Sequence, residues 1–184
     1  MAVLIEGISV VVRCNAIVAA YKGGPEQFTA EVPNGSLRAD GQIAAVTFMH
    51  PTDVEQYVRL LEARGLVFQD AEGTRDIVVV DQRTGFCNPC TWADFGTTPW
   101  NGDESRLVAV CALDAGQPQK VVVPDGWAYE TSLTARHRFV ESDPVSEGLR
   151  FVRRDGDVNV YLDEKTGKEF YSVQGVGVGS PVAH

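Results

Sequence analysis

Apolar residues in the first half of the chain form short segments, some with the pattern of a strand and others with the pattern of a helix. Valine-rich runs such as 76–82 are typical of buried strands, because β-branched side chains fit a pleated, packed surface. On this pattern, strands are predicted at 3–13, 36–39, 42–49, 66–69 and 76–82.

The clearest helix is predicted at 52–64. Val54, Tyr57, Val58 and Leu61 stand at i, i+3, i+4 and i+7, so they form one apolar stripe that packs on a sheet. Thr52, with Glu55 three residues later, forms a capping-box pattern at its start, and Gly65 ends it. Two shorter helices are predicted, at 15–21 and at 25–32.

The second half keeps the strand pattern but has no helix pattern of comparable length. Strands are predicted there at 105–113, 120–123, 127–131, 135–140, 149–153, 158–162 and 169–173. The predicted class is therefore α+β, with one or two largely antiparallel sheets and with helices mainly in the N-terminal half.

Several turn and strand motifs occur twice in the same order. VPNG at 32–35 returns as VPDG at 123–126, and GLVFQDAEGTRDIVVVDQRTG at 65–85 matches GLRFVRRDGDVNVYLDEKTG at 148–167. These matches predict two degenerate repeats that form one compact unit. The predicted parts are an N-terminal α+β repeat (1–90), an aromatic connecting loop (91–104), a C-terminal β-rich repeat (105–174) and a flexible tail (175–184).

The stretch AAVTFMHPTDVEQYVRLLEARGLVF, at 44–68, resembles the opening of a glyoxalase-type βαβββ module. Members of that family are built from paired modules, so the resemblance implies a second, similar module. The second half of this chain has no corresponding helix, and no matching His/Glu set stands on the strands of both halves. We therefore assign the chain to no family.

Charge and composition narrow the classes of partner. The 184 residues are 44% apolar, which is typical of a folded protein. Their net charge of −9 repels nucleic-acid phosphates and anionic lipids at long range. No apolar run approaches the roughly 18 residues that a membrane span needs. The N-terminus lacks the pattern of a signal peptide, and four unevenly spaced cysteines are typical of reduced thiols, so we expect a cytoplasmic protein.

The cysteine pair in GFCNPCTW, Cys87 and Cys90, raises the alternative of an enzyme. Thiol-redox chemistry needs a helix directly after such a pair to lower the thiol pKa, and Gly96, Pro99 and Gly102 prevent one. A zinc site would need two further thiols, from Cys14 and Cys111.

Other chemistry has few candidates. Metal-dependent chemistry would rely on His50, His137 and nearby acids. The glycine-rich GVGVGSP at 175–181 is followed by no helix, so it is no phosphate loop. We assign no catalytic residue, no metal and no cofactor.

The segment between the repeats combines aromatic and acidic side chains. Its rings either seal the edge of a core, as large apolar groups in loops usually do, or form a recognition surface. The candidate partner-binding residues are Trp92, Asp94, Phe95, Trp100, Asp103 and Glu104.

The sequence as a whole favours a binding module over an enzyme. Two forms stay open: an acidic inhibitor or immunity-type protein that covers a basic surface, and a small-ligand binder that uses a groove between the repeats. Its partner is therefore an unknown protein or small ligand, with a basic partner favoured. The alternative is an enzyme with Cys87/Cys90 thiol-redox or metal-dependent chemistry.

Overall fold

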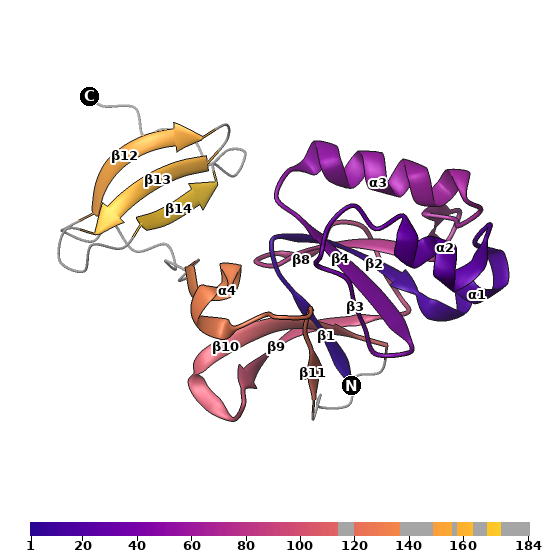
Figure 1. Ribbon diagram of the computed structural model, residues 1–184, viewed down its shortest axis with the longest axis horizontal. Helices are drawn as coiled ribbons and strands as arrows, with labels where there is room; N and C mark the ends of the chain where they lie inside the picture. The colour runs from indigo at the N-terminus through magenta and orange to yellow at the C-terminus, as the bar shows by residue number, and fades with distance from the viewer. Residues whose placement is uncertain (114–119, 137–148, 156–157, 164–168, 174–184) are drawn as a thin grey trace. The chain divides into compact units, whose positions relative to one another are not determined.

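The computed structural model describes residues 1–113, 120–136, 149–155, 158–163 and 169–173. The chain divides into two compact units, Met1–Ala128 and Tyr129–His184, which we call unit 1 and unit 2. Figure 1 shows the elements of each unit with their labels.

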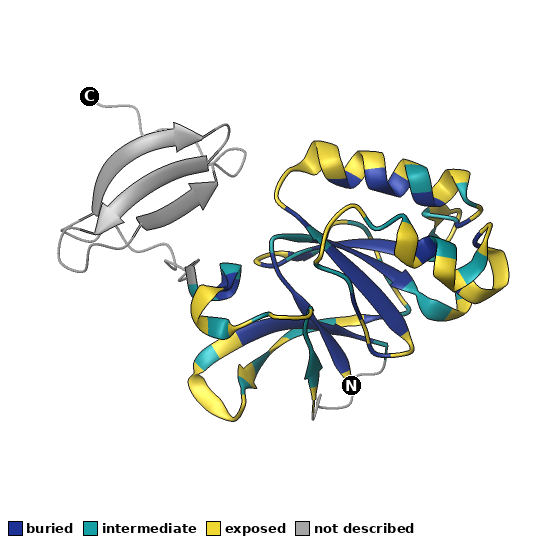
Figure 2. Cartoon of the chain, viewed as in Figure 1, coloured by how far each residue is buried: buried dark blue, intermediate teal, exposed yellow. Residues whose placement is uncertain are grey.

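Unit 1 is built on a five-stranded antiparallel sheet. Its strands, in spatial order, are β3 (Arg38–Ala39), β4 (Ile43–Phe48), β2 (Ile8–Arg13), β7 (Ile77–Asp81) and β8 (Gly85–Phe86). Val10, on the central strand, lies opposite Val46 on one side and Val79 on the other. The valine-rich runs thus pair with one another at the middle of the sheet, where Figure 2 shows the strands buried.

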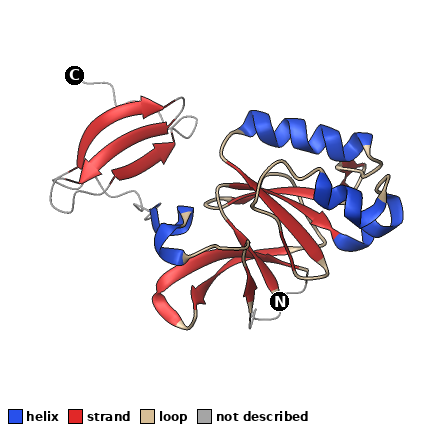
Figure 3. Cartoon of the chain, viewed as in Figure 1, coloured by secondary structure: helices blue, strands red, loops and turns tan. Residues whose placement is uncertain are grey.

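Three helices cover one face of this sheet, as Figure 3 shows. They are α1 (Cys14–Ala20), α2 (Gly24–Ala30) and α3 (Pro51–Ala63). The apolar stripe of α3 is buried against the sheet, and Leu61 is fully buried. The predicted cap is wrong: the N-cap residue is His50 and not Thr52, because Pro51, which needs no N–H partner, takes the first helical position.

The other face packs against a four-stranded sheet. In spatial order its strands are β11 (Val121–Val122), β1 (Ala2–Ile5), β10 (Asp103–Ala112) and β9 (Asp94–Trp100). Within it, β1 pairs with β11 in parallel, and the other two pairs are antiparallel. Side chains that include Val3, Val11, Val78 and Cys111 fill the space between the two sheets.

The prediction of one strand over 3–13 is wrong, because the chain changes sheets in the middle of this run. Gly7 has φ +53°, a backbone region that glycine reaches without steric strain. It separates β1, in the four-stranded sheet, from β2, in the five-stranded sheet.

Part of the predicted connecting loop is also a strand. β9 pairs with β10 along most of its length, and Asn101 and Gly102 connect the two strands. Both residues have positive φ, +51° and +79°, as a tight hairpin turn requires. The Asn-Gly dipeptide between two extended segments was the sequence signal for this hairpin.

A two-stranded hairpin completes the strands described in unit 1, formed by β5 (Gln69–Asp70) and β6 (Gly73–Thr74). Unit 2 contains a short 3-10 helix, η1 (Tyr129–Thr131), and helix α4 (Leu133–Arg136). Its three-stranded antiparallel sheet has the order β12 (Leu149–Asp155), β13 (Val158–Asp163) and β14 (Glu169–Val173).

Two strands predicted near the start of unit 2 are wrong as far as the structure describes them. Residues 129–131 form η1, and residues 135–136 belong to α4. The hydroxyl group of Ser132 accepts a hydrogen bond from the backbone N–H of Ala135, at 3.0 Å, and so caps α4. This local bond favours a helical turn over an extended chain.

The α+β class with largely antiparallel sheets is confirmed. The duplication and the repeat boundaries stay predictions, and the predicted tail at 175–184 lies outside the described residues. Among the helices that the structure describes, none is long and apolar enough to span a bilayer.

Candidate functional site

Trp92 packs at the edge of the core between the two sheets of unit 1. Its ring is partly buried, and its Nε1–H donates to the backbone oxygen of Thr74 at 3.1 Å. The Arg13 guanidinium lies over the ring, 5.5 Å from its centroid. These contacts give the ring a structural role.

The other two rings of the predicted site also have intramolecular partners. Phe95 contacts Phe86 edge to face, with 6.3 Å between the ring centroids. Trp100 contacts Trp127 in the same manner at 4.8 Å, and the Trp127 Nε1–H donates to a carboxylate oxygen of Glu6 at 3.0 Å. Such contacts stabilise the packing of the β9–β10 hairpin.

The three predicted acids are exposed, but they stand at opposite ends of this hairpin. Asp94 begins β9, whereas Asp103 and Glu104 follow the turn at its far end. A seven-residue strand is about 20 Å long at about 3.3 Å per residue. The six predicted residues are therefore not gathered around one point.

All four cysteine thiols are free. Burial raises the pKa of Cys14 and Cys87, and raises that of the Cys111 thiol to about 12. Cys90 is followed by β9 and not by a helix, so no helix dipole supports a thiolate there. Among the described residues, no three or more His, Cys, Asp and Glu side chains form a group that would hold a metal ion.

His50, the N-cap residue of α3, is exposed and makes no capping hydrogen bond through its side chain. His137 lies outside the described residues.

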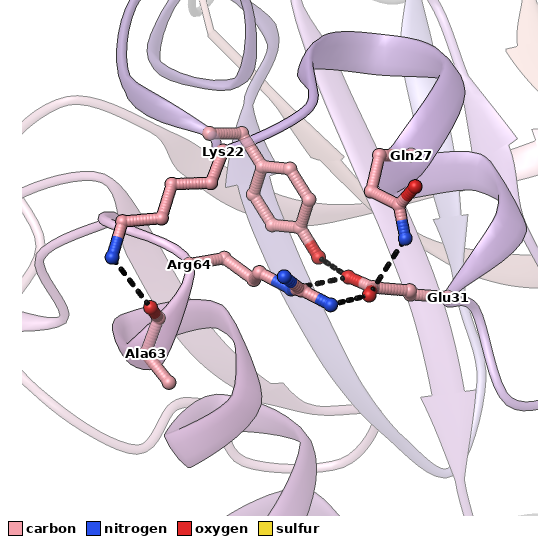
Figure 4. A network of polar contacts seen from close by, with 6 residues as sticks. Lys22, Gln27, Glu31, Ala63 and Arg64 are labelled. Atoms are coloured by element: carbon pink, nitrogen blue, oxygen red, sulfur yellow. Dashed lines mark hydrogen bonds and ion pairs between the residues drawn. The ribbon is translucent and has the colours of Figure 1, made fainter.

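A network of hydrogen-bonded polar side chains joins α2 to α3 (Figure 4). Its centre is Glu31, the C-cap residue of α2. The carboxylate accepts hydrogen bonds from the Tyr21 hydroxyl at 2.6 Å, from Gln27 Nε2 at 2.8 Å and from Arg64 Nε at 2.9 Å. A second bond from Arg64, through Nη2, makes this ion pair bidentate.

The network changes the proton affinity of its members. Hydrogen bonds, first of all from the Tyr21 hydroxyl, lower the pKa of Glu31. Burial, and then the bond to Glu31, raises the pKa of Tyr21. The pair with Glu31 raises the pKa of Arg64.

Replacing Glu31 should therefore alter the acid side of the stability curve. Because its pKa is lower in the folded protein, its ionised form stabilises the fold above its ordinary pKa of 4.5, and this stabilisation disappears as the pH falls through the folded pKa. The stability difference between the wild type and Glu31→Gln should shrink as the pH is lowered. Urea denaturation followed by tryptophan fluorescence measures this in unit 1, since Trp92, Trp100 and Trp127 all belong to it.

Glu104→Gln, a change at an exposed glutamate outside the network, is the control. The free energy of unfolding of Glu104→Gln should depend on pH as that of the wild type does. If the Glu31→Gln difference stayed constant down to strongly acidic pH, the assigned direction of the Glu31 pKa shift would be wrong.

Beside this network, unit 1 has a cavity of 360 Å³, which we call the Glu31 cavity. It opens between α3 and the segment that connects α2 to β4. Its lining comprises two acids, two amides and four largely apolar side chains: Glu31, Asp53, Asn34, Gln56, Pro33, Phe48, Tyr57 and Leu60. No lysine, arginine or histidine belongs to this lining, and Arg64, which pairs with Glu31, lies outside it.

Tyr57 is the most unusual residue of the cavity. Only 4% of it is exposed, and among the described residues its buried hydroxyl group has no hydrogen-bond partner. Its ring lies against Phe48, with 5.2 Å between the centroids. A buried hydroxyl without a partner is costly, and such groups in native proteins often mark a function.

A second cavity, of 320 Å³, follows the other flank of α3. Val54, Val58, Phe68 and Val79 give it an apolar lining, to which Cys87 also contributes. Its charged residues are Arg59, which pairs with Glu55, and Glu62. Because a basic side chain belongs to this lining, and none of the unpaired buried polar atoms of the described residues does, the second cavity is the poorer candidate for a cationic group.

Sequence reasoning missed the Glu31 cavity, although two signals were present. Asp53, Gln56, Tyr57 and Leu60 stand at i, i+3, i+4 and i+7, so they share one flank of α3. Glu31 ends a short helix, where the helix dipole disfavours a negative charge, so its presence calls for a compensating partner.

Comparison with family models, curated proteins and solved structures finds no match for this chain. Of the sites predicted from sequence, the structure gathers neither the hairpin acids nor the thiols into one centre. Within the described residues, the Glu31 cavity is the place where acidic, aromatic and unpaired polar groups meet.

Proposed function

We propose that this chain is a binding module that recognises a basic partner through the α3 side of unit 1. The observation that carries the proposal is the Glu31 cavity, which is open, acidic at two points and free of basic residues in its lining. A concave site with an apolar wall and a few polar groups is the usual form of a binding pocket, and 360 Å³ falls within the usual range of volumes.

Charge supports this proposal. Residues 1–128 contain 9 basic and 16 acidic side chains, so unit 1 has a net charge of −7 out of the −9 of the whole chain. Three exposed acids, Asp53, Glu55 and Glu62, lie on α3. Of these, Glu55 forms an exposed ion pair with Arg59 at 3.7 Å, while Asp53 and Glu62 pair with no basic side chain that the structure describes. Such a surface attracts a positively charged partner at long range.

Two forms of this function follow from the same site. An acidic inhibitor or immunity-type protein would cover a basic protein surface with the exposed side of α3, and a small-ligand binder would use the cavity alone. We favour the first form, because the acids extend along α3 beyond the cavity. The cytoplasmic location, the absence of nucleic-acid partners and the origin from two repeats, with a groove between them, are further parts of this proposal.

The enzyme alternative receives less support. Burial raises the pKa of the Cys87 thiol, which lowers its reactivity at neutral pH. Catalysis by Cys87 and Cys90 would also need a group that activates a thiolate, and the described residues near them supply acids instead, such as Asp81, which raises the Cys87 pKa further.

A pair of synthetic peptides tests the proposed function. One is rich in lysine and arginine, and the other has glutamine at each basic position. Unit 1 should bind the basic peptide only, and the affinity should fall roughly tenfold or more between ionic strengths of about 0.01 M and 1 M, as the screening length drops from about 30 Å to about 3 Å. Fluorescence anisotropy of the labelled peptides, added to the full chain, measures both.

Matched charge reversals locate the surface. Glu62→Lys, on the exposed side of α3, should weaken binding of the basic peptide, whereas Glu72→Lys, in the β5–β6 turn, makes the same charge change elsewhere and should weaken it less. Equal binding of both peptides, or binding that salt leaves unchanged, would refute the proposed function.

A further inference from the structure

We propose that the Glu31 cavity receives a primary alkylammonium group, namely the end of a lysine side chain of the partner. This inference rests on the proposed function and specifies its chemistry. Three observations carry it: the Tyr57 hydroxyl and the Asp53 carboxylate have no hydrogen-bond or ion-pair partner, respectively, among the described residues, and both oxygens of Glu31 are occupied.

The Tyr57 hydroxyl supplies a hydrogen-bond acceptor that no group of the described residues uses. Its oxygen is shielded from water, so it receives little compensation from solvent. An incoming N–H donor would give the oxygen its missing partner, and a charged donor forms a stronger bond than a neutral one. The hydroxyl could also donate, but the carboxylates of Glu31 and Asp53 in the same lining disfavour an anionic acceptor, so the proposed ligand is a hydrogen-bond donor and a cationic one.

The acids of the cavity contribute unequally. Both oxygens of Glu31 already accept bonds from Tyr21, Gln27 and Arg64, so its charge is largely compensated. Asp53 is exposed in the first turn of α3 and pairs with no basic side chain that the structure describes. It is the carboxylate that remains available to an incoming cation.

This arrangement favours ammonium over guanidinium. The Tyr57 hydroxyl offers a single acceptor oxygen, whereas a guanidinium group binds best where two oxygens accept parallel hydrogen bonds, as those of Glu31 do for Arg64. A compact ammonium needs only single acceptors. Phe48, Tyr57 and Leu60 belong to the lining of the cavity, and their apolar atoms suit the alkyl stem of a lysine side chain.

Three small probes test the inference with the full chain: the N-acetyl, N-methylamide derivatives of lysine, of arginine and of norleucine. Norleucine has the alkyl stem without the charge. In chemical-shift titrations of the ¹⁵N-labelled protein, the lysine probe should shift backbone signals of α3 and of residues 31–34, and norleucine should not. The arginine probe should bind more weakly than the lysine probe.

Variants identify the contacting groups. Tyr57→Phe removes only the hydroxyl group, and should weaken binding of the lysine probe about tenfold, the effect of losing a hydrogen bond to a charged group. Asp53→Asn should weaken it about threefold, as for an exposed charge pair. Glu104→Gln, at an exposed acid of the β9–β10 hairpin, should leave the affinity unchanged.

The folded state of Tyr57→Phe provides an internal check. Because the hydroxyl has no partner in the part of the chain that the structure describes, its removal should not lower the free energy of unfolding. Weaker binding by this variant would then reflect a lost contact with the probe.

Three outcomes would overturn the inference: equal binding of norleucine and lysine, an unchanged affinity in Tyr57→Phe, or an effect of Glu104→Gln as large as that of Asp53→Asn. A basic peptide that binds in a salt-dependent way while the lysine probe does not bind would overturn this inference and leave the proposed function standing. If neither the peptide nor the probe binds, both fail.

Discussion

Replacing Arg38 with methionine should lower the free energy of unfolding of unit 1 by about 3–5 kcal/mol, the usual effect of removing one member of a buried charged network. Arg38 belongs to the short strand β3, and only 3% of it is exposed. Methionine keeps an apolar stem of similar length, so the loss reports on the guanidinium group.

The guanidinium group connects four segments of unit 1. Nε donates to the backbone oxygen of Leu4 at 2.6 Å, at the end of β1, and Nη2 donates to the Ser9 hydroxyl on β2 at 2.8 Å. Nη1 donates to the backbone oxygen of Ser36 at 2.9 Å and to Thr47 Oγ1 at 2.8 Å. Without these donors, buried acceptors lose their partners at the place where the chain passes from one sheet to the other.

The charge of Arg38 adds to the expected loss of stability. Burial lowers the pKa of Arg38 to about 10, and nearby Glu6 acts in the opposite direction. The guanidinium therefore stays charged at neutral pH and compensates the buried carboxylate of Glu6, of which 7% is exposed. Methionine would leave that carboxylate without this compensation.

Urea denaturation followed by tryptophan fluorescence measures the effect, and two variants provide controls. Arg59→Met removes an exposed arginine that forms only a surface ion pair with Glu55, so its effect should be about 1 kcal/mol or less. Arg38→Lys keeps the charge but not the planar, forked guanidinium group, so its loss of stability should lie between those of Arg38→Met and Arg59→Met. A loss below about 1 kcal/mol in Arg38→Met would show that the four hydrogen bonds contribute little.

The local elements of unit 1 were largely predictable, because their signals lie close together in the sequence. The apolar runs at 42–49 and 76–82 correspond to β4 and β7, and the stripe of Val54, Tyr57, Val58 and Leu61 corresponds to α3. The pairing of strands into two sheets was not predictable in this way. β1 and β2 form one apolar run, and only the bend at Gly7 assigns them to different sheets.

The candidate site was harder to predict because it depends on contacts between distant residues. Glu31 and Arg64 are 33 positions apart, and nothing local pairs them. The sequence predicted a partner-binding site around position 95 instead, because aromatic and acidic residues on a glycine-rich segment are a common sign of a recognition surface. In the structure, Trp92, Phe95 and Trp100 contact other parts of unit 1.

The same reasoning explains why a polar atom in an apolar stripe was overlooked. Tyr57 fits the helix pattern as a core residue, and its ring does pack in the core. A sequence pattern records that the residue is apolar enough to be buried, but not whether its hydroxyl finds a partner. The contact that we propose at this position depends on one atom.

Replacing Leu61 with alanine should lower the free energy of unfolding of unit 1 by about 2–5 kcal/mol, the range for large-to-small changes in a packed core. Leu61 is fully buried between α3 and the five-stranded sheet. Alanine is the most favourable residue for a helix interior, so the loss would come from packing and not from the helix backbone. Urea denaturation followed by tryptophan fluorescence measures it.

Leu107→Ala is the matched control, since Leu107 is 50% exposed on β10 and the same three carbon atoms are removed. Its effect should be about 0.5 kcal/mol or less, as for most surface substitutions. If both variants lost the same stability, the packing of α3 on the sheet would be looser than its buried stripe implies. Because the Glu31 cavity is formed on one flank of α3, a loosely packed helix would also remove the fixed geometry that the proposed recognition of a lysine side chain requires.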